Sequence, residues 1–292
     1  MNVLIQSLIA VLILASNATA SGDFLVDTAS SDIIGAVSTY TIRNNETLIE
    51  LAREYDVGYN EIAAANEKID PWVPERGTEI ILPTAWILPY HSDNEIIINL
   101  AEMRLYYFFS IDETRYVTTY PLGIGRQGFT TPKGSFTITA RVKDPVWTVP
   151  ERIRQELPEL PSIVPPGPEN PLGKYWIQLS LNGYGIHGTN RPYGIGRKVS
   201  NGCIRLYPED IERLYRTTRV GTPVRIINEP VKAGKDKNRV YIEVHRSETH
   251  ESELLNIAFD KLGEKRLLRY VDTSLIVNEL KRATGLPAVI SK

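Results

Sequence analysis

The sequence predicts a mostly β protein, with a small α+β module before a larger, mainly antiparallel β domain and a short strand–helix–helix tail after it. Short apolar runs bounded by Gly and Pro fill residues 95–227, a pattern typical of antiparallel strands. Helical periodicity is concentrated before and after this stretch. With 42% hydrophobic and 23% charged residues over 292 positions, the composition is that of a folded protein with a sizeable core.

The charge balance argues against a nucleic-acid partner. The formal net charge of −2 arises from 33 basic and 35 acidic residues that are interleaved along the chain. Proteins that bind DNA or RNA gather Lys and Arg into a stripe or patch. We therefore predict no nucleic-acid binding.

The N-terminus indicates export. Val3–Leu14 is an apolar run, and Ala18-Thr19-Ala20 follows at the spacing of a signal-peptidase site. The run is short for a membrane span. We expect a signal peptide over residues 1–20 and a protein that is exported to an extracytoplasmic space. Because no Lys or Arg precedes the run, a buried N-terminal helix is the alternative. Residues 21–37 are polar and are expected to form a loose leader.

Residues 38–85 are predicted to form a small βααβ module. Tyr40–Ile42 alternates like a short strand, and the apolar positions from Leu48 to Tyr55 fall on one helical face. A second short helix ends near Asn66, and Glu79–Leu82 forms the closing strand.

This module resembles a LysM domain. The residues that carry the resemblance are Tyr40-Thr-Ile, Glu46-Thr-Leu48, Leu51-Ala52, Tyr55-Asp-Val57, Asn66 and Gly77 through Pro83, while Asn45-Glu46 stands where the family has Gly-Asp. The resemblance implies binding to N-acetylglucosamine-containing glycans such as peptidoglycan; a packing module without glycan affinity is the alternative. As a tether, the module should be removable without loss of acylation of a soluble tetrapeptide.

The larger domain is predicted from a series of short strands. They are interrupted by the proline-rich residues 144–173, where a long insertion without periodicity is typical of a functional lid. A helix is expected over Pro208–Tyr215. The expected strands are 96–98, 105–109, 115–120, 135–142, 175–179, 184–187 and 224–227.

The tail, residues 229–292, carries no recognisable catalytic pattern. Arg239–His245 alternates as a strand, and helices are expected around residues 254–262 and 274–285. His245 and His250 are predicted to lie at the surface. Because no group of His, Cys, Asp or Glu has the spacing of a zinc site, we predict neither a metal nor a cofactor.

The only cysteine of the chain, Cys203, lies in the pattern most typical of catalysis. A lone cysteine is most often a small buried hydrophobe. Here Ser200-Asn-Gly-Cys203-Ile-Arg205 forms a glycine-containing turn before a predicted helix, and His187 ends a strand shortly before it. Turn glycines allow backbone N–H groups to converge on an oxyanion, and a nearby histidine can take the thiol proton.

These segments resemble the L,D-transpeptidase catalytic domain. The match is carried by His187-Gly-Thr189 and by Ser200, Gly202, Cys203, Ile204 and Arg205, with further similarity at Gly123-Ile-Gly125, Thr131-Pro-Lys-Gly134 and Asn170-Pro-Leu-Gly173. Asn201 departs from the family, which often has a second histidine there. The resemblance implies an antiparallel β-sandwich-like catalytic domain over residues 92–228.

The resemblance also implies the roles of the site residues in a penicillin-insensitive transferase. Cys203 would attack a stem tetrapeptide of peptidoglycan and release D-Ala, with His187 as acid and base and the Gly188 carbonyl orienting the imidazole. The N–H groups of Asn201, Gly202 and Cys203 would form the oxyanion hole. Arg205 would bind a substrate carboxylate or brace the turn. Candidate substrate contacts are Thr189, Ser200, Tyr193 and Trp147.

The acyl group would pass to an amine, forming a 3-3 cross-link or anchoring an outer-membrane lipoprotein. Two alternatives stay open: a hydrolase of the same fold (an L,D-carboxypeptidase or amidase), and a non-catalytic peptidoglycan-binding protein. A papain-like protease is disfavoured, because the local signature around its cysteine and the distant asparagine are lacking.

Overall fold

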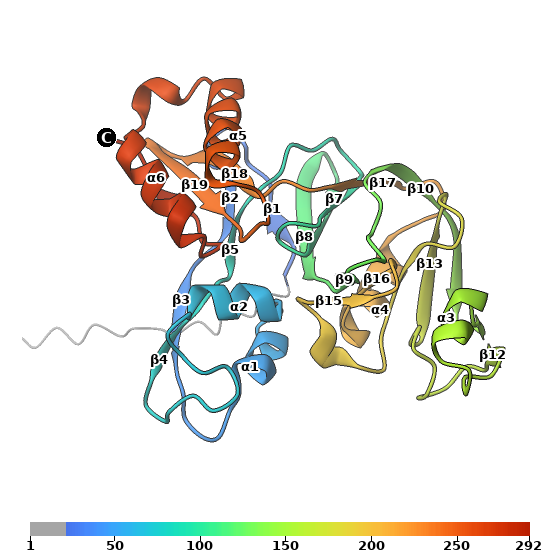
Figure 1. The fold of residues 1–292 in the computed structure, drawn as a ribbon. Coiled ribbons are helices and arrows are strands. Elements are labelled where there is room, and N and C mark those ends of the chain that lie inside the picture. Colours follow the sequence, from blue (N-terminus) through green and yellow to red (C-terminus); the bar gives the residue numbers. More distant parts are fainter. Residues whose placement is uncertain (1–21) are drawn as a thin grey trace, which may run out of the picture.

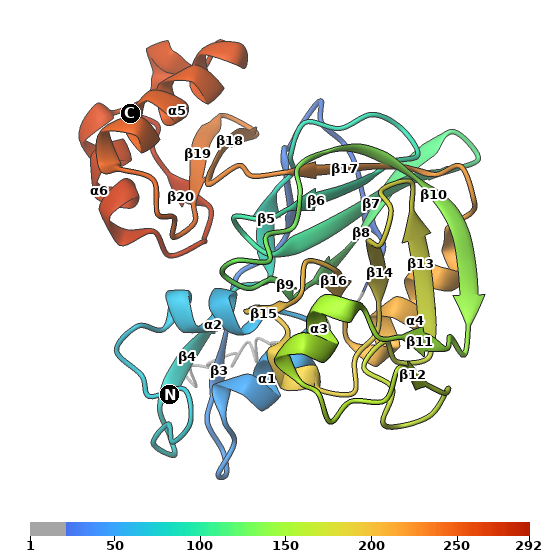
Figure 2. The ribbon, with the colours of Figure 1, turned by 45° about the vertical axis from the view of Figure 1, so that its right-hand side comes forward.

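A computed structural model describes residues 22–292 (Figure 1); the predicted signal peptide lies outside this range. The chain forms an N-terminal module (blue), a central β domain (green to gold) and a C-terminal module (orange to red) (Figures 1 and 2). The mostly β prediction is confirmed. No helix within 22–292 is long and apolar enough to cross a membrane.

The N-terminal module has the βααβ order that the sequence predicts. β3 (Ser38–Thr41) pairs antiparallel with β4 (Glu79–Leu82), and α1 (Leu48–Glu54) and α2 (Tyr59–Ala65) lie between them in the chain. Thr47 caps α1: its hydroxyl accepts from the Glu50 N–H at 3.1 Å, while the Glu50 carboxylate accepts from the Thr47 N–H at 2.9 Å. Such a capping box satisfies two N–H groups that a helix start leaves unpaired.

The central domain is built on a nine-stranded sheet in the order β1-β8-β7-β6-β17-β10-β13-β14-β16. Most neighbours are antiparallel, but β17 pairs with β6, and β14 with β16, in parallel. The strands are β1 (Phe24–Leu25), β6 (Ile96–Asn99), β7 (Arg104–Ile111), β8 (Thr114–Pro121), β10 (Gly134–Lys143), β13 (Tyr175–Leu179), β14 (Gly185–His187), β16 (Ile204–Arg205) and β17 (Pro223–Ile227).

The expectation of a loose leader is wrong. β1 forms the edge of the central sheet by pairing with β8, and β2 (Ile33–Gly35) pairs with β5 (Ala85–Ile87). These strands are only two or three residues long, too short for an alternating pattern to show in the sequence.

The two faces of the central sheet pack into different cores. Alternate residues of a strand point to opposite faces. Ile96 and Ile98 of β6 accordingly join the core beneath α4 (Pro208–Thr217), and the intervening Ile97 joins a core shared with the N-terminal module. This shared core contains Leu48 and Ile62 of the module. The module is therefore packed on the sheet.

Polar contacts reinforce this interface. Arg104 of β7 is completely buried, and its guanidinium forms an ion pair with Glu61 of α2 at 2.8 Å. A close backbone approach lies nearby: the N–H groups of Tyr59 and Asn60 donate to the carbonyls of Ile195 and Gly196, each at 3.3 Å. A Cβ at Gly196 would lie 2.2 Å from the Tyr59 nitrogen, so only glycine fits.

A pair of buried carboxyl groups lies at the same interface. Asp56 follows α1 and Asp210 is in the first turn of α4, and both are buried. Burial, opposed in part by Arg104, raises the pKa of Asp56 to about 6, and burial together with Asp56 raises the pKa of Asp210 well above its usual range. The folded protein therefore holds protons here that the unfolded chain releases near pH 4.

We expect this pair to make stability fall as pH rises. Because both folded-state pKa values are raised, the contribution is complete below about pH 4 and is lost as pH rises through about 6. Asp210→Asn should raise the free energy of unfolding at pH 8 by about 2 kcal/mol and leave it unchanged at pH 4. Urea unfolding at both pH values measures this, with the exposed Asp260→Asn as control. An equal change in the free energy of unfolding at both pH values would contradict the raised pKa values of the two carboxyl groups.

The proline-rich residues 144–173 contain structure that the sequence did not predict. β11 (Trp147–Thr148) pairs with β12 (Ile163–Val164), and α3 (Glu151–Glu156) lies between them. Asn170, which is completely buried, ties the segment together: its amide donates to the Pro145 carbonyl at 2.8 Å and its oxygen accepts from the Leu172 N–H at 2.9 Å.

The C-terminal module has its own apolar core. The predicted strand and two helices are present as β19 (Arg239–Val244), α5 (Glu251–Glu264) and α6 (Thr273–Arg282). β18 (Val231–Asp236) and β20 (Ala288–Val289) flank β19 and were not predicted. A short 3-10 helix, η2 (Leu268–Tyr270), joins α5 to α6.

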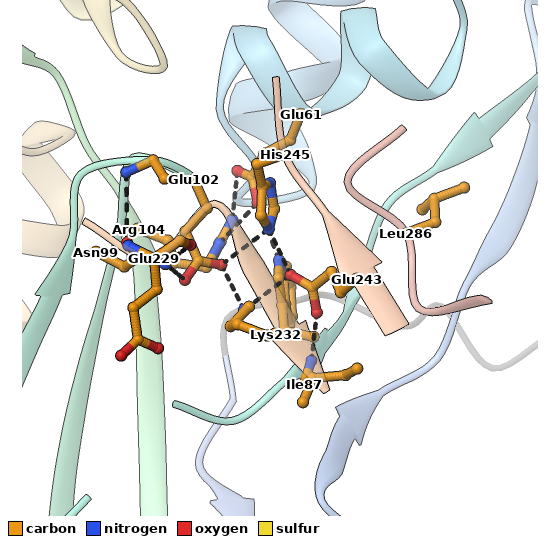
Figure 3. A network of polar contacts seen from close by, with 12 residues as sticks. Glu61, Ile87, Asn99, Glu102, Arg104, Glu229, Lys232, Glu243, His245 and Leu286 are labelled. Carbon is orange, nitrogen blue, oxygen red and sulfur yellow. Dashed lines mark hydrogen bonds and ion pairs between the residues drawn. The ribbon is translucent and has the colours of Figure 1, made fainter. Parts of the chain in front are cut away.

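The prediction that His245 lies at the surface is wrong. His245 is buried, and its Nε2 lies 2.7 Å from the Glu243 carboxylate (Figure 3). Lys232 lies between two carboxylates, 2.7 Å from Glu102 and 2.8 Å from Glu243 (Figure 3). The side chains of Glu102, Glu243 and His245 converge as metal ligands would, but the Lys232 ammonium already lies between the two carboxylates and offsets part of their charge. We interpret the cluster as an electrostatic link between the sheet and the C-terminal module.

Candidate active site

A cavity of about 640 Å³ contains most of the predicted site residues. It lies between the turn that carries Cys203, the end of β14 and the 144–173 segment. The predicted residues that line it are His187, Ser200, Asn201, Cys203, Arg205 and Trp147.

Hydroxyl groups fix the turn that carries Cys203. β15 (Lys198–Ser200) leads into the turn, and the two-residue β16 separates it from α4. The Ser200 hydroxyl accepts from the Gly202 N–H at 3.1 Å and donates to the Cys203 carbonyl. The Thr131 hydroxyl donates to the Gly202 carbonyl at 2.9 Å. Ser200 therefore uses its hydroxyl to shape the turn.

Gly202 is required by the geometry of this turn. Its φ is +107°, and an added Cβ would lie 2.8 Å from the ring of Tyr184. A side chain there would be strained by both the backbone and the ring. Tyr184 thus packs against the turn from the β13–β14 connection, a contact that the sequence did not indicate.

His187 is held through its Nδ1, and no hydrogen bond to its Nε2 is found among residues 22–292. Its Nδ1 lies 2.7 Å from the Gly188 carbonyl. Because a carbonyl only accepts, Nδ1 carries the proton and Nε2 has the lone pair. The Trp176 ring stacks on the imidazole with centroids 5.6 Å apart, which further restricts its orientation. The arrangement leaves Nε2 as the basic nitrogen.

The histidine and the thiol are both neutral at rest. Burial, and after it the charge of Arg205, lower the pKa of His187 to about 3. Burial raises the pKa of the Cys203 thiol, although the Gly185 N–H and Arg205 partly oppose this. A preformed thiolate–imidazolium pair is therefore disfavoured. This arrangement is suited to transfer of the thiol proton to the imidazole while the thiol reacts.

Two backbone donors of the turn are available for an oxyanion. The Gly202 N–H is committed to Ser200 at 3.1 Å. Among residues 22–292, the N–H groups of Asn201 and Cys203 have no hydrogen-bond partner. Of the predicted donors, these two can bind a ligand without breaking an internal contact.

Arg205 directs an unpaired guanidinium to the cavity. It lines the cavity and forms no side-chain hydrogen bond or ion pair with any residue of the described chain, and its Nε is buried without a partner. Burial lowers its pKa. A buried donor without a partner is costly, so this group is suited to an anionic ligand.

Two residues that were predicted to contact the substrate do not line the cavity. Thr189 is buried and its hydroxyl accepts from the Arg191 N–H at 2.9 Å, which shapes the local turn. Tyr193 lies on the short 3-10 helix η1 (Pro192–Gly194), is exposed, and is not among the residues that line the cavity.

Arg126 was missed as a site residue. Its Nε donates to the Asn201 side-chain oxygen at 3.1 Å, and its guanidinium pairs with Glu156 of α3 at 2.6 Å. It thus joins the catalytic turn to the 144–173 segment. Its position directly after the recognised Gly123-Ile-Gly125 was the available signal.

Comparisons with known proteins identify the family of each domain. The family model described as L,D-transpeptidase catalytic domain matches residues 93–226, and the LysM domain model matches residues 40–83. The probable L,D-transpeptidase ErfK/SrfK of Salmonella typhimurium is 37% identical over 277 residues, covering 89% of this chain and 88% of that protein.

Two relatives from Escherichia coli are similarly close. The probable L,D-transpeptidase YcfS is 38% identical over 228 residues, covering 75% of this chain and 71% of that protein. The probable L,D-transpeptidase YbiS is 40% identical over 226 residues, covering 75% and 73%. The chain therefore belongs to the L,D-transpeptidase family and carries a LysM domain before its catalytic domain.

Proposed function

We propose that this L,D-transpeptidase acts in the periplasm through a thioester on Cys203. The observation that carries the proposal is that Cys203 and His187 line one cavity, with His187 held by the Gly188 carbonyl so that Nε2 is free. The substrate is a peptidoglycan stem tetrapeptide, in agreement with the peptidoglycan-directed LysM and catalytic domains.

In the first half-reaction, His187 takes the thiol proton as Sγ attacks the carbonyl between the L-centre of the diamino acid and the terminal D-Ala. The N–H groups of Asn201 and Cys203 bind the oxyanion. When the C–N bond breaks, His187 returns the proton to the departing D-Ala amine.

In the second half-reaction, an acceptor amine attacks the thioester carbonyl. His187 takes a proton from this amine and delivers it to the thiolate that leaves. The new amide is a 3-3 cross-link when the amine belongs to another stem, and a wall anchor when it belongs to an outer-membrane lipoprotein. With water as the nucleophile, the same thioester would be hydrolysed.

The test is intact-mass spectrometry after incubation with a carbapenem, which acylates a competent thiol. We expect an adduct on the wild type and none on Cys203→Ala. Absence of an adduct on folded wild-type protein would overturn the proposal. Products from a tetrapeptide, with and without an added amine, then distinguish transfer from hydrolysis.

Arg205 should recognise the free carboxylate of the terminal D-Ala. A hydrogen bond to a charged group contributes about 1.5–3 kcal/mol. Arg205→Gln should therefore lower kcat/KM for the tetrapeptide by about 10–100-fold and for its C-terminal amide far less. Steady-state kinetics on both substrates measure this. Arg191→Gln, which changes an exposed arginine outside the cavity, is the control; equal losses on both substrates would favour the turn-bracing role.

A further inference from the structure

A second cavity, of about 1350 Å³, adjoins the turn that carries Cys203 through two of its lining residues, Arg126 and Thr131. One wall is the loop that follows β9 (Ile124–Gly125), from Arg126 to Lys133, and the opposite wall is residues 246–253 of the C-terminal module. This module, which the proposed mechanism does not use, therefore builds one side of a large opening.

The floor of the second cavity is bonded to the catalytic turn. The N–H of Arg126 donates to the Ser200 carbonyl at 2.9 Å, and its Nε donates to the Asn201 side chain at 3.1 Å. Thr131, which also lines the second cavity, donates to the Gly202 carbonyl at 2.9 Å. Two residues that line this cavity, Arg126 and Thr131, therefore contact the turn that carries Cys203.

An exposed ion pair, Arg126–Glu156, links the linings of the two cavities. Arg126 lines the second cavity, and its ion-pair partner Glu156 is on α3, whose Arg152 and Ile153 line the first. The side chains of Arg126 and Glu156 are 40% and 44% exposed. An exposed pair of this kind contributes at most about 1 kcal/mol, so it can open without large cost.

The second cavity presents charges of both signs, including Arg246, which is paired with Glu67. Lys133 lies on the loop that follows β9, and Glu253 lies on α5. Neither side chain forms an ion pair with any residue in 22–292. Lys198 and Glu248 pair across the opening at 3.1 Å, with Glu248 94% exposed. An amine-and-carboxylate ligand would find a partner for each of its charges here.

We propose that this cavity binds the acceptor: a peptide whose diamino acid carries a free side-chain amine and a nearby carboxylate. The inference rests on the proposed function, which requires a second substrate. Both proposed acceptors, a stem peptide and a lipoprotein, can present this chemistry. Glu253 attracts the ammonium end and Lys133 the carboxylate, and the amine reaches the thioester across the Arg126–Glu156 pair.

The test separates acylation from transfer in the full-length enzyme. Acylation by a tetrapeptide is followed by intact mass, and transfer against hydrolysis is measured as a product ratio at fixed acceptor concentration. One arm uses a stem tripeptide as acceptor and the other a short peptide that ends in lysine. The variants are Glu253→Gln, Lys133→Ala and the double substitution.

We expect acylation rates within twofold of wild type and a transfer-to-hydrolysis ratio at least fivefold lower in each variant for the natural acceptor. The arm that shows the loss identifies the source of the acceptor. The controls are Glu251→Gln, on the same helix but outside the cavity, and the exposed Lys281→Ala on α6; both should leave the ratio unchanged.

An unchanged ratio in the double variant, in both arms, would overturn the acceptor site. So would an equal loss in Glu251→Gln, because that would indicate a general charge effect. If wild-type enzyme fails to acylate, the proposed function fails and this inference falls with it. Circular dichroism of each variant confirms that the fold is intact.

Discussion

Replacing His187 by alanine should lower the rate of Cys203 acylation by about 10²–10⁴-fold, the usual contribution of a positioned acid–base residue. The thiol pKa is raised by burial, so little thiolate forms without a base. The variant should still bind substrate, because the Arg205 guanidinium and the backbone donors of the turn do not depend on the imidazole. Rapid-mixing mass spectrometry of the acyl-enzyme measures the effect.

The pH profile should show how the base works. Because the pKa of His187 is lowered to about 3, the imidazole is already unprotonated at pH 5, and wild-type acylation should be nearly independent of pH from 5 to 7. In His187→Ala, attack needs a spontaneously formed thiolate, so the rate should rise about tenfold per pH unit below the thiol pKa. The exposed His250→Ala is the matched control for acylation. A wild-type rate that falls with a midpoint near pH 6.5 would contradict the buried, neutral base.

Local patterns in the sequence predicted much of the fold. Strands such as β6 and β7 are apolar runs between turn residues, and the βααβ module has its helix face and closing strand within a short stretch of chain. β18 was not predicted, because a lysine such as Lys232, the second residue of this strand, is normally a surface residue. Its partners, Glu102 and Glu243, are distant in sequence, and no local rule identifies a lysine that is buried by such pairing.

The site was partly predictable because several of its residues stand in local sequence motifs. Cys203, His187 and Arg205 stand in short motifs whose chemistry can be inferred from residue type and spacing. The commitment of the Gly202 N–H to Ser200 is a matter of three-dimensional geometry. The role of Arg126 depends on a contact with Asn201, 75 positions away. Position in sequence suggested Tyr193, but the fold places it outside the cavity.

The N-terminal module should prove inseparable from the catalytic domain, contrary to its expected role as a removable tether. Deleting residues 38–85 would expose Ile97, Tyr106 and Phe108, which now share a core with the module. It would also leave the completely buried Arg104 without Glu61. We expect the truncated protein to lose cooperative unfolding and carbapenem acylation together.

A point substitution tests the same interface without removing chain. Glu61→Gln should lower the free energy of unfolding by about 3–5 kcal/mol, because it leaves the Arg104 charge buried and uncompensated. Glu54→Gln, on the exposed face of α1, should change it by less than about 0.5 kcal/mol. Urea unfolding compares the two. A truncated protein that folds and is acylated like the wild type would support the original expectation that the module is a removable tether. Loss of both properties would instead mean that the sheet needs the LysM module to cover the face opposite α4, so that glycan binding and catalysis reside in one folded unit.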